Sequence, residues 1–409
     1  MIIKRIKAEN YKSYKHIDIE LNKLNFIVGG NASGKSNFVN MLKFFNDIIY
    51  YGIDDALLLQ GGIKYLFNSN CKKTECVSLY YDVDLSTEEN NMTHYFKDED
   101  GSPYLPNFLK YQIKIKPHEY GDGYKIVNEK INIKFKKNTK EKATKKEYVL
   151  QIEKDSKGKI IDDFSSLEKK EDDFFCINYT EKIMRREENL LKSFFNAFGI
   201  FFRYDSKIKI YNFDVNLLKS PSSIVARSEL EENGANLVNI IQQLLKNKTK
   251  KDKLKKIIKT LLPFVDDINV ENNVNKSVFF KVKESYNKGE FPSYMLSDGT
   301  VNILAVIVAL YFQDDNDIIV LEEPERNIHP KLLSSLVKIL SDVSNKTQIF
   351  VTTHNPFIIK EANLNDVILV SRNDKGISKV SKPINDGRIK MFLENDLGIE
   401  DLFVDGILK

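Results

Sequence analysis

The sequence predicts an α/β fold in which a mixed sheet has a parallel core, an antiparallel part and an inserted helical subdomain. Three observations support this prediction. An apolar strand at residues 24–28 runs into a glycine-rich loop, and a helix with apolar residues at spacings of three and four follows. The last third of the chain alternates strand and helix, as parallel sheets do. Residues 77–152 instead alternate apolar and polar residues, which is typical of half-buried strands.

Length and composition describe a globular protein with room for one large domain or two ordinary ones. The chain has 409 residues, of which 42% are hydrophobic and 29% are charged. A net charge of +4 neither demands nor forbids a nucleic-acid partner. Cys71, Cys76 and Cys176 form no C-x-x-C pair, which argues against a disulfide scaffold or a zinc site. Because no apolar run suits a signal sequence or a membrane span, we expect a cytoplasmic protein without a membrane partner.

The order of the expected elements suggests where the chain divides. The expected strands lie at residues 2–6, 16–19, 24–28, 278–282, 318–321 and 349–352, and the expected helices at 36–49, 181–198, 236–262, 301–311 and near Pro356. We therefore predict a core formed by residues 1–84 and 265–409, with a β-rich and helical region inserted at 85–264. No sustained heptad pattern is present, so coiled-coil arms are not expected.

A phosphate-binding loop is predicted between the strand at 24–28 and the helix after it. Its residues match the pattern G-x-x-x-x-G-K-[ST] and are Gly29, Gly30, Asn31, Ala32, Ser33, Gly34, Lys35 and Ser36. The glycines let backbone N–H groups close around phosphates, and the helix adds the positive end of its dipole. Lys35 would bind the β- and γ-phosphates of ATP, and the hydroxyl of Ser36 would bind Mg²⁺. The alternative is a glycine-rich turn that arose by chance.

An apolar strand at 318–321 ends in two adjacent carboxylates, as the Walker B strand of nucleotide hydrolases does. In this interpretation Glu322 holds the metal's water shell and Glu323 polarises the attacking water. A glutamate at the first of these positions departs from the more common aspartate, and its extra methylene lengthens the link to Mg²⁺. The alternative is an acidic strand end that faces solvent.

Two further segments complete the pattern of an ATP site. Residues 296–300 resemble the ABC signature loop, in which Ser297 and the amide of Gly299 would grip the γ-phosphate of ATP. Serine also caps helices, so a plain helix N-terminus is the alternative. His354 follows a strand where ABC-type ATPases carry a switch histidine that hydrogen-bonds the γ-phosphate, although a lone histidine there is otherwise a simple loop residue.

The order of these four motifs is more specific than any one of them. By this order the chain resembles the SMC-like and RecF-like branch of ABC ATPases, which includes overcoming-lysogenization-defect ATPases and small bacterial "AAA family" defence ATPases. Residues 322–330 resemble this group's E-E-P-E-x-x-x-H-P run, in which His329 lies in the D-loop that crosses the dimer. Residues 10–14 resemble its N-F-[RK]-S-[FY] opening, in which Lys12 and Ser13 lie near the nucleotide. The resemblance implies an ABC-type P-loop ATPase head.

Gln60 is a candidate for the family's Q-loop, and a surface helix end is the alternative. The resemblance also implies a head-to-head homodimer that binds two ATP with Mg²⁺, with Glu323 and His354 as catalytic residues. No TOPRIM-like set of carboxylates follows His354. Our first hypothesis is therefore an ATPase switch for a separate effector protein, expected to be a nuclease in anti-phage defence.

Two other functions stay open at this point. The alternative is a DNA repair or recombination ATPase of RecF type that binds DNA directly. A nucleotide-binding subunit of a transporter is disfavoured, because the segment between the phosphate loop and the signature is too long. Lys251, Lys255 and Lys259 share one face of a predicted helix and could follow a phosphate backbone. A solvated helix face is the favoured interpretation, because aromatic residues and arginines are missing there.

Overall fold

The computed structural model describes residues 1–72, 74–86, 104–118, 123–137, 147–157, 159–163, 189–202, 208–223, 229–272, 277–313 and 317–385. The chain forms two compact units, and each is described by itself. Unit 1 comprises Met1–Asn22, Ala32–Lys207 and Val370–Ser381. Unit 2 comprises Lys23–Asn31, Ile208–Leu369 and Lys382–Lys409. The division predicted at residues 84 and 265 rests on sequence character, and it stays a prediction.

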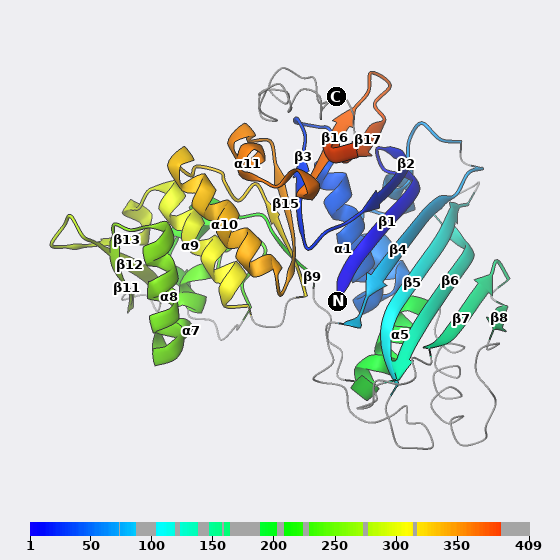
Figure 1. The fold of residues 1–409 in the computed structure, drawn as a ribbon, viewed down its shortest axis with the longest axis horizontal. Coiled ribbons are helices and arrows are strands. Elements are labelled where there is room, and N and C mark those ends of the chain that lie inside the picture. Colours follow the sequence, from blue (N-terminus) through cyan, green and yellow to red (C-terminus); the bar gives the residue numbers. More distant parts are fainter. Residues whose placement is uncertain are drawn as a thin grey trace. The chain divides into compact units, whose positions relative to one another are not determined.

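Unit 1 is built on a largely antiparallel sheet (Figure 1). Its strands are, in spatial order, β8 (Ile160–Asp163), β7 (Glu147–Asp155), β6 (Tyr124–Lys137), β5 (Tyr104–Pro117), β4 (Val77–Asp84), β1 (Ile2–Tyr11), β2 (Tyr14–Glu20) and β17 (Ser378–Ser381). All neighbours pair antiparallel except β17, which pairs with β2 in parallel. In β6, Ile131 and Ile133 are buried while Asn132 and Lys134 are partly exposed. The predicted antiparallel part is therefore confirmed.

Helices of unit 1 pack against this sheet and against each other. Helix α1 (Lys35–Tyr51) begins one residue earlier than expected, and its residues Phe38, Leu42 and Phe45 are fully buried. The short helices α2 (Ile53–Leu59) and α3 (Ile63–Leu66) follow it. Helix α5 (Leu190–Phe202) contacts both α1 and β6. Residues 181–188 of the helix expected at 181–198 lie outside the described residues.

A buried carboxyl group joins β6 to the beginning of α5. Oε1 of Glu129 accepts hydrogen bonds from the Tyr111 hydroxyl at 2.8 Å and from Asn189 Nδ2 at 2.6 Å. The same oxygen accepts a bond from the backbone N–H of Leu190 at 3.0 Å, so Glu129 satisfies a donor at the helix N-terminus. Burial raises the pKa of Glu129 to about 7, against the opposing effect of these hydrogen bonds.

Unit 2 contains the predicted parallel core. Its strands are, in spatial order, β16 (Val367–Arg372, which belongs to this unit as far as Leu369), β3 (Leu24–Val28), β15 (Gln348–Thr353), β14 (Ile318–Glu322) and β9 (Ile208–Tyr211). Every neighbouring pair in this run is parallel. All residues of β3 and β15 are buried, as expected for strands of a parallel sheet covered on both faces. The helices α9 (Asp298–Tyr311), α10 (Leu333–Ser344) and α11 (Pro356–Glu361) belong to the same unit.

A second sheet of unit 2 is antiparallel and has four strands. They are β10 (Ser222–Ser223), β12 (Ser277–Glu284), β11 (Val265–Asn272) and β13 (Glu290–Pro292). The short helix α6 (Val215–Lys219) contacts α9. Helices α7 (Leu237–Lys246) and α8 (Lys248–Leu261) contact the strands β11 and β12.

The stretch expected to be helical at 236–262 is helical, and the structure divides it into two helices. The chain leaves the helical conformation at Asn247, where φ is −100° and ψ is 117°. The side chain of Asn247 accepts a hydrogen bond from the backbone N–H of Lys250 at 3.0 Å and so caps α8. Apolar residues continue at helical spacing on both sides of this break, which is why periodicity alone suggested one helix.

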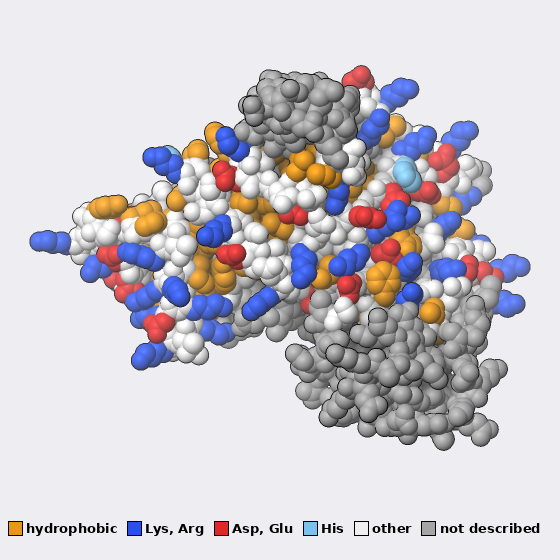
Figure 2. All heavy atoms as spheres, viewed as in Figure 1, with side chains coloured by type: hydrophobic (Ala, Val, Ile, Leu, Met, Phe, Trp, Pro, Cys, Tyr) orange, Lys and Arg blue, Asp and Glu red, His pale blue; other side chains and the backbone are white. Residues whose placement is uncertain are grey.

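Two of the three lysines in the row on α8 form ion pairs with acidic residues of β11. Lys255 Nζ lies 2.8 Å from Asp267 Oδ1, and Lys259 Nζ lies 2.7 Å from Asp266 Oδ1. Figure 2 shows acidic side chains among the basic ones on the visible face of the molecule. These ion pairs favour the solvated helix face over a track for a phosphate backbone.

Cys71 and Cys76 are free thiols, and Cys176 lies outside the described residues. Within the ranges that the structure describes, no group of three or more His, Cys, Asp or Glu side chains is placed to hold a metal ion. None of the helices in those ranges is both long enough and apolar enough to cross a membrane.

Replacing Glu129 with glutamine should make the stability of the protein less dependent on pH. The pKa of Glu129 in the folded state is about 7, which exceeds the ordinary value of 4.5. The contribution of Glu129 to the free energy of unfolding is therefore fully present below pH 4.5 and is lost as the pH rises through 7. Glutamine keeps the accepting oxygen and stays neutral. Between about pH 5 and pH 8 the free energy of unfolding of Glu129→Gln should therefore fall by about 3 kcal/mol less than that of the unmodified chain.

Urea unfolding followed by circular dichroism across this pH range would measure the difference. Glu20→Gln is a suitable control, because the side chain of Glu20 is 77% exposed. A Glu129→Gln profile parallel to that of the unmodified chain would contradict the assignment of the pH dependence to this carboxyl group.

Candidate nucleotide site

Three loops begin at the same edge of the parallel sheet in unit 2. Val28, the last residue of β3, pairs with Thr353, the last residue of β15. Glu322, the last residue of β14, pairs with Thr352 of β15. Parallel α/β proteins bind ligands at the carboxyl ends of their strands, where such loops leave the sheet. The first residues of the predicted phosphate loop therefore emerge beside the two predicted catalytic residues.

Part of the predicted phosphate loop belongs to unit 2. The backbone N–H of Gly29 donates a hydrogen bond to the carbonyl of Thr353 at 3.4 Å, which continues the strand pairing into the loop. Gly29 is buried, whereas Gly30 and Asn31 are exposed. A Cβ atom at Gly30 would meet nothing within 4 Å, so the space beside this glycine is open.

The remainder of the loop belongs to unit 1, where its backbone is held by side chains from distant segments. The hydroxyl of Tyr14 donates to the carbonyl of Gly34 at 2.9 Å, and the hydroxyl of Ser378 donates to the carbonyl of Ser33 at 2.6 Å. Gly34 has a φ of +123°, and a Cβ atom there would lie 2.6 Å from Ser378 Oγ. Glycine is therefore required at this position for both backbone and space.

The remaining loop residues differ in exposure. Ala32 is exposed with a left-handed φ of 58°, and its carbonyl accepts a bond from Arg372 Nη1 at 3.3 Å. Lys35 is only 9% exposed and is the first residue of α1. Ser36 is exposed. Their predicted roles towards phosphate and Mg²⁺ stay predictions.

The two residues of the N-terminal motif lie in different surroundings within unit 1. The Ser13 hydroxyl accepts a hydrogen bond from Asn37 Nδ2 at 2.8 Å, and its oxygen lies 2.8 Å from Ser378 Oγ, so Ser13 lies beside the phosphate loop. Lys12 Nζ donates to Oε1 of Gln60 at 2.8 Å, and burial lowers the pKa of Lys12. The structure thus brings Lys12 together with the Q-loop candidate, and the roles of both residues towards a nucleotide stay predictions.

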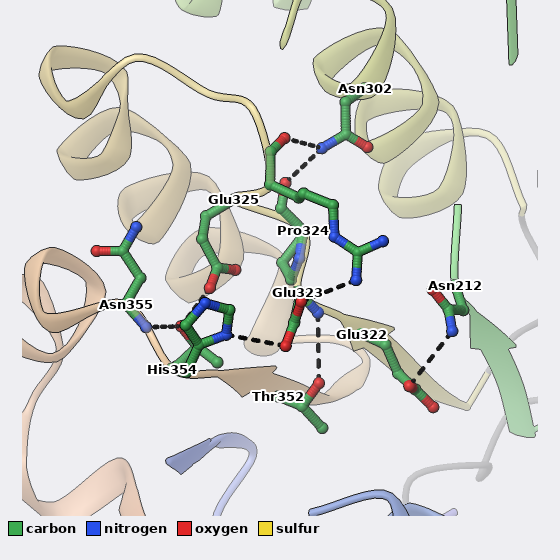
Figure 3. A network of polar contacts seen from close by, with 11 residues as sticks. Asn212, Asn302, Glu322, Glu323, Pro324, Glu325, Thr352, His354 and Asn355 are labelled. Carbon is green, nitrogen blue, oxygen red and sulfur yellow. Dashed lines mark hydrogen bonds and ion pairs between the residues drawn. The ribbon is translucent and has the colours of Figure 1, made fainter. Parts of the chain in front are cut away.

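The carboxylate of Glu323 is held from two sides in unit 2 (Figure 3). Oε1 lies 2.9 Å from Nδ1 of His354, and Oε2 accepts a bond from Nη2 of Arg326 at 2.8 Å. Burial acts to raise the pKa of Glu323, but the hydrogen bonds to Arg326 and His354 outweigh it and hold the pKa below its ordinary value. Glu323 is therefore ionised at neutral pH, as a proton acceptor must be.

The neighbouring carboxylates have different surroundings. Oε2 of Glu322 lies 3.5 Å from Nδ2 of Asn212, which directly follows β9. Carboxylate and hydroxyl oxygens are the ligands that Mg²⁺ prefers, so the donor chemistry of Glu322 and Ser36 fits that ion. Glu325 is buried, accepts a hydrogen bond from the Thr353 hydroxyl, and has a pKa raised by burial. It serves to join the loop after β14 to β15.

The predicted signature segment forms the N-terminus of α9. The Ser297 side chain accepts a hydrogen bond from the backbone N–H of Thr300 at 3.2 Å, so this serine is the N-cap of the helix. A Cβ atom at Gly299 would lie 2.4 Å from the carbonyl oxygen of Asn327. The helix terminus therefore packs directly against the loop after β14. His329, at the end of this loop, caps a 3₁₀ turn at Pro330–Leu332.

Asn302 is a residue that the sequence interpretation missed. It is 3% exposed, and its Nδ2 donates hydrogen bonds to the carbonyls of Pro324 at 2.8 Å and Arg326 at 2.9 Å (Figure 3). The available signal was a single amide within an otherwise apolar helix, since buried amides require hydrogen-bond partners. Asn212, Ser378 and the other partners from distant segments left no local signal.

Comparison with known proteins places the chain in a family. The family described as "AAA domain, putative AbiEii toxin, Type IV TA system" matches residues 24–360. The chain belongs to this family. The Septu protein PtuA of Bacillus mycoides (strain KBAB4) is 27% identical over 149 residues, which cover 34% of this chain and 20% of PtuA. The chain thus matches only a fifth of that relative's length.

A solved structure supports the fold of this AAA-family chain. An SMC head bound to the C-winged helix domain of ScpA is similar with a TM-score of 0.53 at 15% identity, over 93% of this chain and 97% of that chain. The predicted fold, a mixed α/β head of the ABC type, is therefore confirmed.

Replacing Gly299 with alanine should destabilise unit 2. The new methyl group would collide with the carbonyl oxygen of Asn327, so α9 or the loop must shift. Overpacking of this kind costs about 1–3 kcal/mol. Urea unfolding would measure the loss, with Gly289→Ala as the matched control because nothing lies within 4 Å of a Cβ atom there. Equal stabilities of the two variants would refute the close packing.

Proposed function

We propose that this chain is a cytoplasmic ATPase that binds ATP and Mg²⁺ between two copies of itself and uses hydrolysis to switch a separate effector protein. The observation that carries the proposal is the hydrogen bond between Glu323 and His354 at the ends of two adjacent parallel strands. The predicted phosphate loop starts from the strand next to them. Membership in an AAA family and the fold of an SMC head support ATP as the substrate.

Each residue of the site has a proposed part in the reaction. Lys35 and the loop amides bind the phosphates of ATP, and Glu323 accepts the proton of the attacking water. His354 orients the Glu323 carboxylate and donates to the γ-phosphate. Ser36 and Glu322 would hold Mg²⁺, which supplies positive charge to the β- and γ-phosphate oxygens when bound.

The second copy would complete the site with its signature segment. Ser297 is exposed at the N-terminus of a 14-residue helix, where a negative phosphate is stabilised by backbone N–H groups and the helix dipole. Tyr294 and Met295, which directly precede it, are 58% and 65% exposed and offer apolar surface to a partner. One phosphate loop and one signature per chain fit a homodimer with two composite sites.

The effector is proposed to be a nuclease acting in anti-phage defence. The family description names a toxin of a type IV toxin–antitoxin system, and the partial match with a Septu protein agrees with a defence setting. Direct DNA binding of RecF type is the alternative. The ion pairs of Lys255 and Lys259 with acidic residues count against the lysine row as its contact surface.

Replacing Glu323 with glutamine should remove the proton acceptor and leave nucleotide binding intact. ATP turnover should fall by about 100-fold or more, and an ATP-bound dimer should persist. Phosphate release and light scattering after size-exclusion chromatography would measure the two effects. The double variant Lys35→Ala/Glu323→Gln is the control and should remain monomeric with ATP. Undiminished turnover of Glu323→Gln would exclude this residue as the base.

Replacing Ser297 with arginine should block hydrolysis, because the arginine would occupy the space of the γ-phosphate of the ATP bound by the partner. The binding of ATP by the single chain should not be weakened. A mixture of Ser297→Arg with Lys35→Ala should regain part of the activity, since one intact loop and one intact signature then meet in a mixed dimer. Titrating one inactive variant with the other would measure this. No recovery, or normal hydrolysis by Ser297→Arg alone, would contradict the composite site.

A further inference from the structure

The loop after β14 contains backbone conformations that are unfavourable without support from neighbouring residues. Glu323 and Asn327 have left-handed φ values of 46° and 63°. Two tight turns close the loop: the N–H of Arg326 donates to the carbonyl of Glu323, and the N–H of Ile328 donates to that of Glu325, both at 3.0 Å. Left-handed conformations of residues other than glycine are unfavourable and persist where the surrounding structure enforces them.

Helix α9 supplies those surroundings at two points. Asn302 donates both of its amide hydrogens to loop carbonyls, those of Pro324 and Arg326. One turn earlier, Gly299 allows the helix backbone to touch the carbonyl of Asn327. Residues spaced by three lie on the same helix face, so both contacts fix the loop to one side of α9.

We infer that Asn302 is a positioning residue of the proposed ATPase reaction. Asn302 links helix α9, which begins at the signature segment, to the carboxylate of Glu323 in the same chain. Asn302 fixes the backbone of Arg326, and the guanidinium of Arg326 holds the carboxylate of Glu323. A shift of α9 is therefore passed to Glu323 through two consecutive hydrogen-bonded steps. The inference rests on the proposed function.

This link has a consequence for a dimer with two composite sites. The signature of a chain would grip the nucleotide of its partner, whereas Glu323 would act on the nucleotide of its own chain. ATP bound in the partner's site would then move α9 of this chain. The loop after β14, which Asn302 holds, would move with α9 and change the position of Glu323 in this chain's own site. Misplacing a reacting group by about 1 Å can cost about 100-fold in rate, so a small movement is sufficient.

The test compares Asn302→Ala with Asn239→Ala. Asn239 lies on α7 of the same unit, is 2% exposed, and likewise donates its amide to two acceptors, Ser222 Oγ and the carbonyl of Ser223. Both changes remove a buried amide of the same kind, so general destabilisation is matched. Asn302→Ala should lower kcat by about tenfold or more with KM for ATP changed less than about twofold. Asn239→Ala should keep kcat within about twofold.

Action through Glu323 is tested by combining variants. The double variant Asn302→Ala/Glu323→Gln should show the same residual turnover as Glu323→Gln, because the group that Asn302 positions is already absent. It should also form the ATP-bound dimer. A further loss of turnover, or failure to dimerise, would overturn the inference. Asn302→Asp and Asn239→Asp, which keep the side-chain shape without amide donors, repeat the comparison if the alanine variant does not fold.

The outcomes separate the inference from the proposed function. Glu323→Gln with full turnover would overturn the proposed function and the inference with it. An inactive Glu323→Gln together with normal kcat in Asn302→Ala would overturn the inference alone.

Discussion

Parallel pairing of β3, β15 and β14 is the constraint on which the candidate site of unit 2 depends. These strands are buried almost throughout, so their register is fixed by packing on both faces of the sheet. A slip of one residue would turn every side chain to the opposite face. The same pairing determines the position along the strand direction at which each of the three loops begins. The contact between Glu323 and His354 thus depends on strand register, because the register places the ends of β14 and β15 side by side.

Buried polar groups then give the loops a single shape. Asn302, Glu325 and Glu129 are each buried, and each joins segments that are distant in sequence. A buried polar group that loses its partners is costly, so each of these contacts strongly favours one arrangement over others that pack equally well. Unit 1 has such a contact at the beginning of α5, and unit 2 has one between α9 and the loop after β14.

The sequence sufficed for the features that are encoded locally. Strand alternation, helix periodicity and the loop at 29–36 are patterns of neighbouring residues, and the parallel and antiparallel sheets followed from them. The break at Asn247 was missed because packing preserves apolar spacing across it, while the cap that causes it is one side chain. Asn302 and Ser378 were missed because their partners lie 22 and more than 340 residues away. Contacts of that range leave no periodic pattern.

The left-handed backbone at Glu323 limits what evolution can place there. Steric conflict disfavours β-branched residues at this φ, and glycine or asparagine would adopt it with the least strain. In the proposed reaction, the carboxylate of Glu323 therefore stands at a position where the backbone conformation alone favours glycine or asparagine. We expect relatives that do not use the proposed reaction to carry glycine or asparagine at the equivalent position. Such a chain would keep the shape of the loop and the fold, and it would lack only the carboxylate.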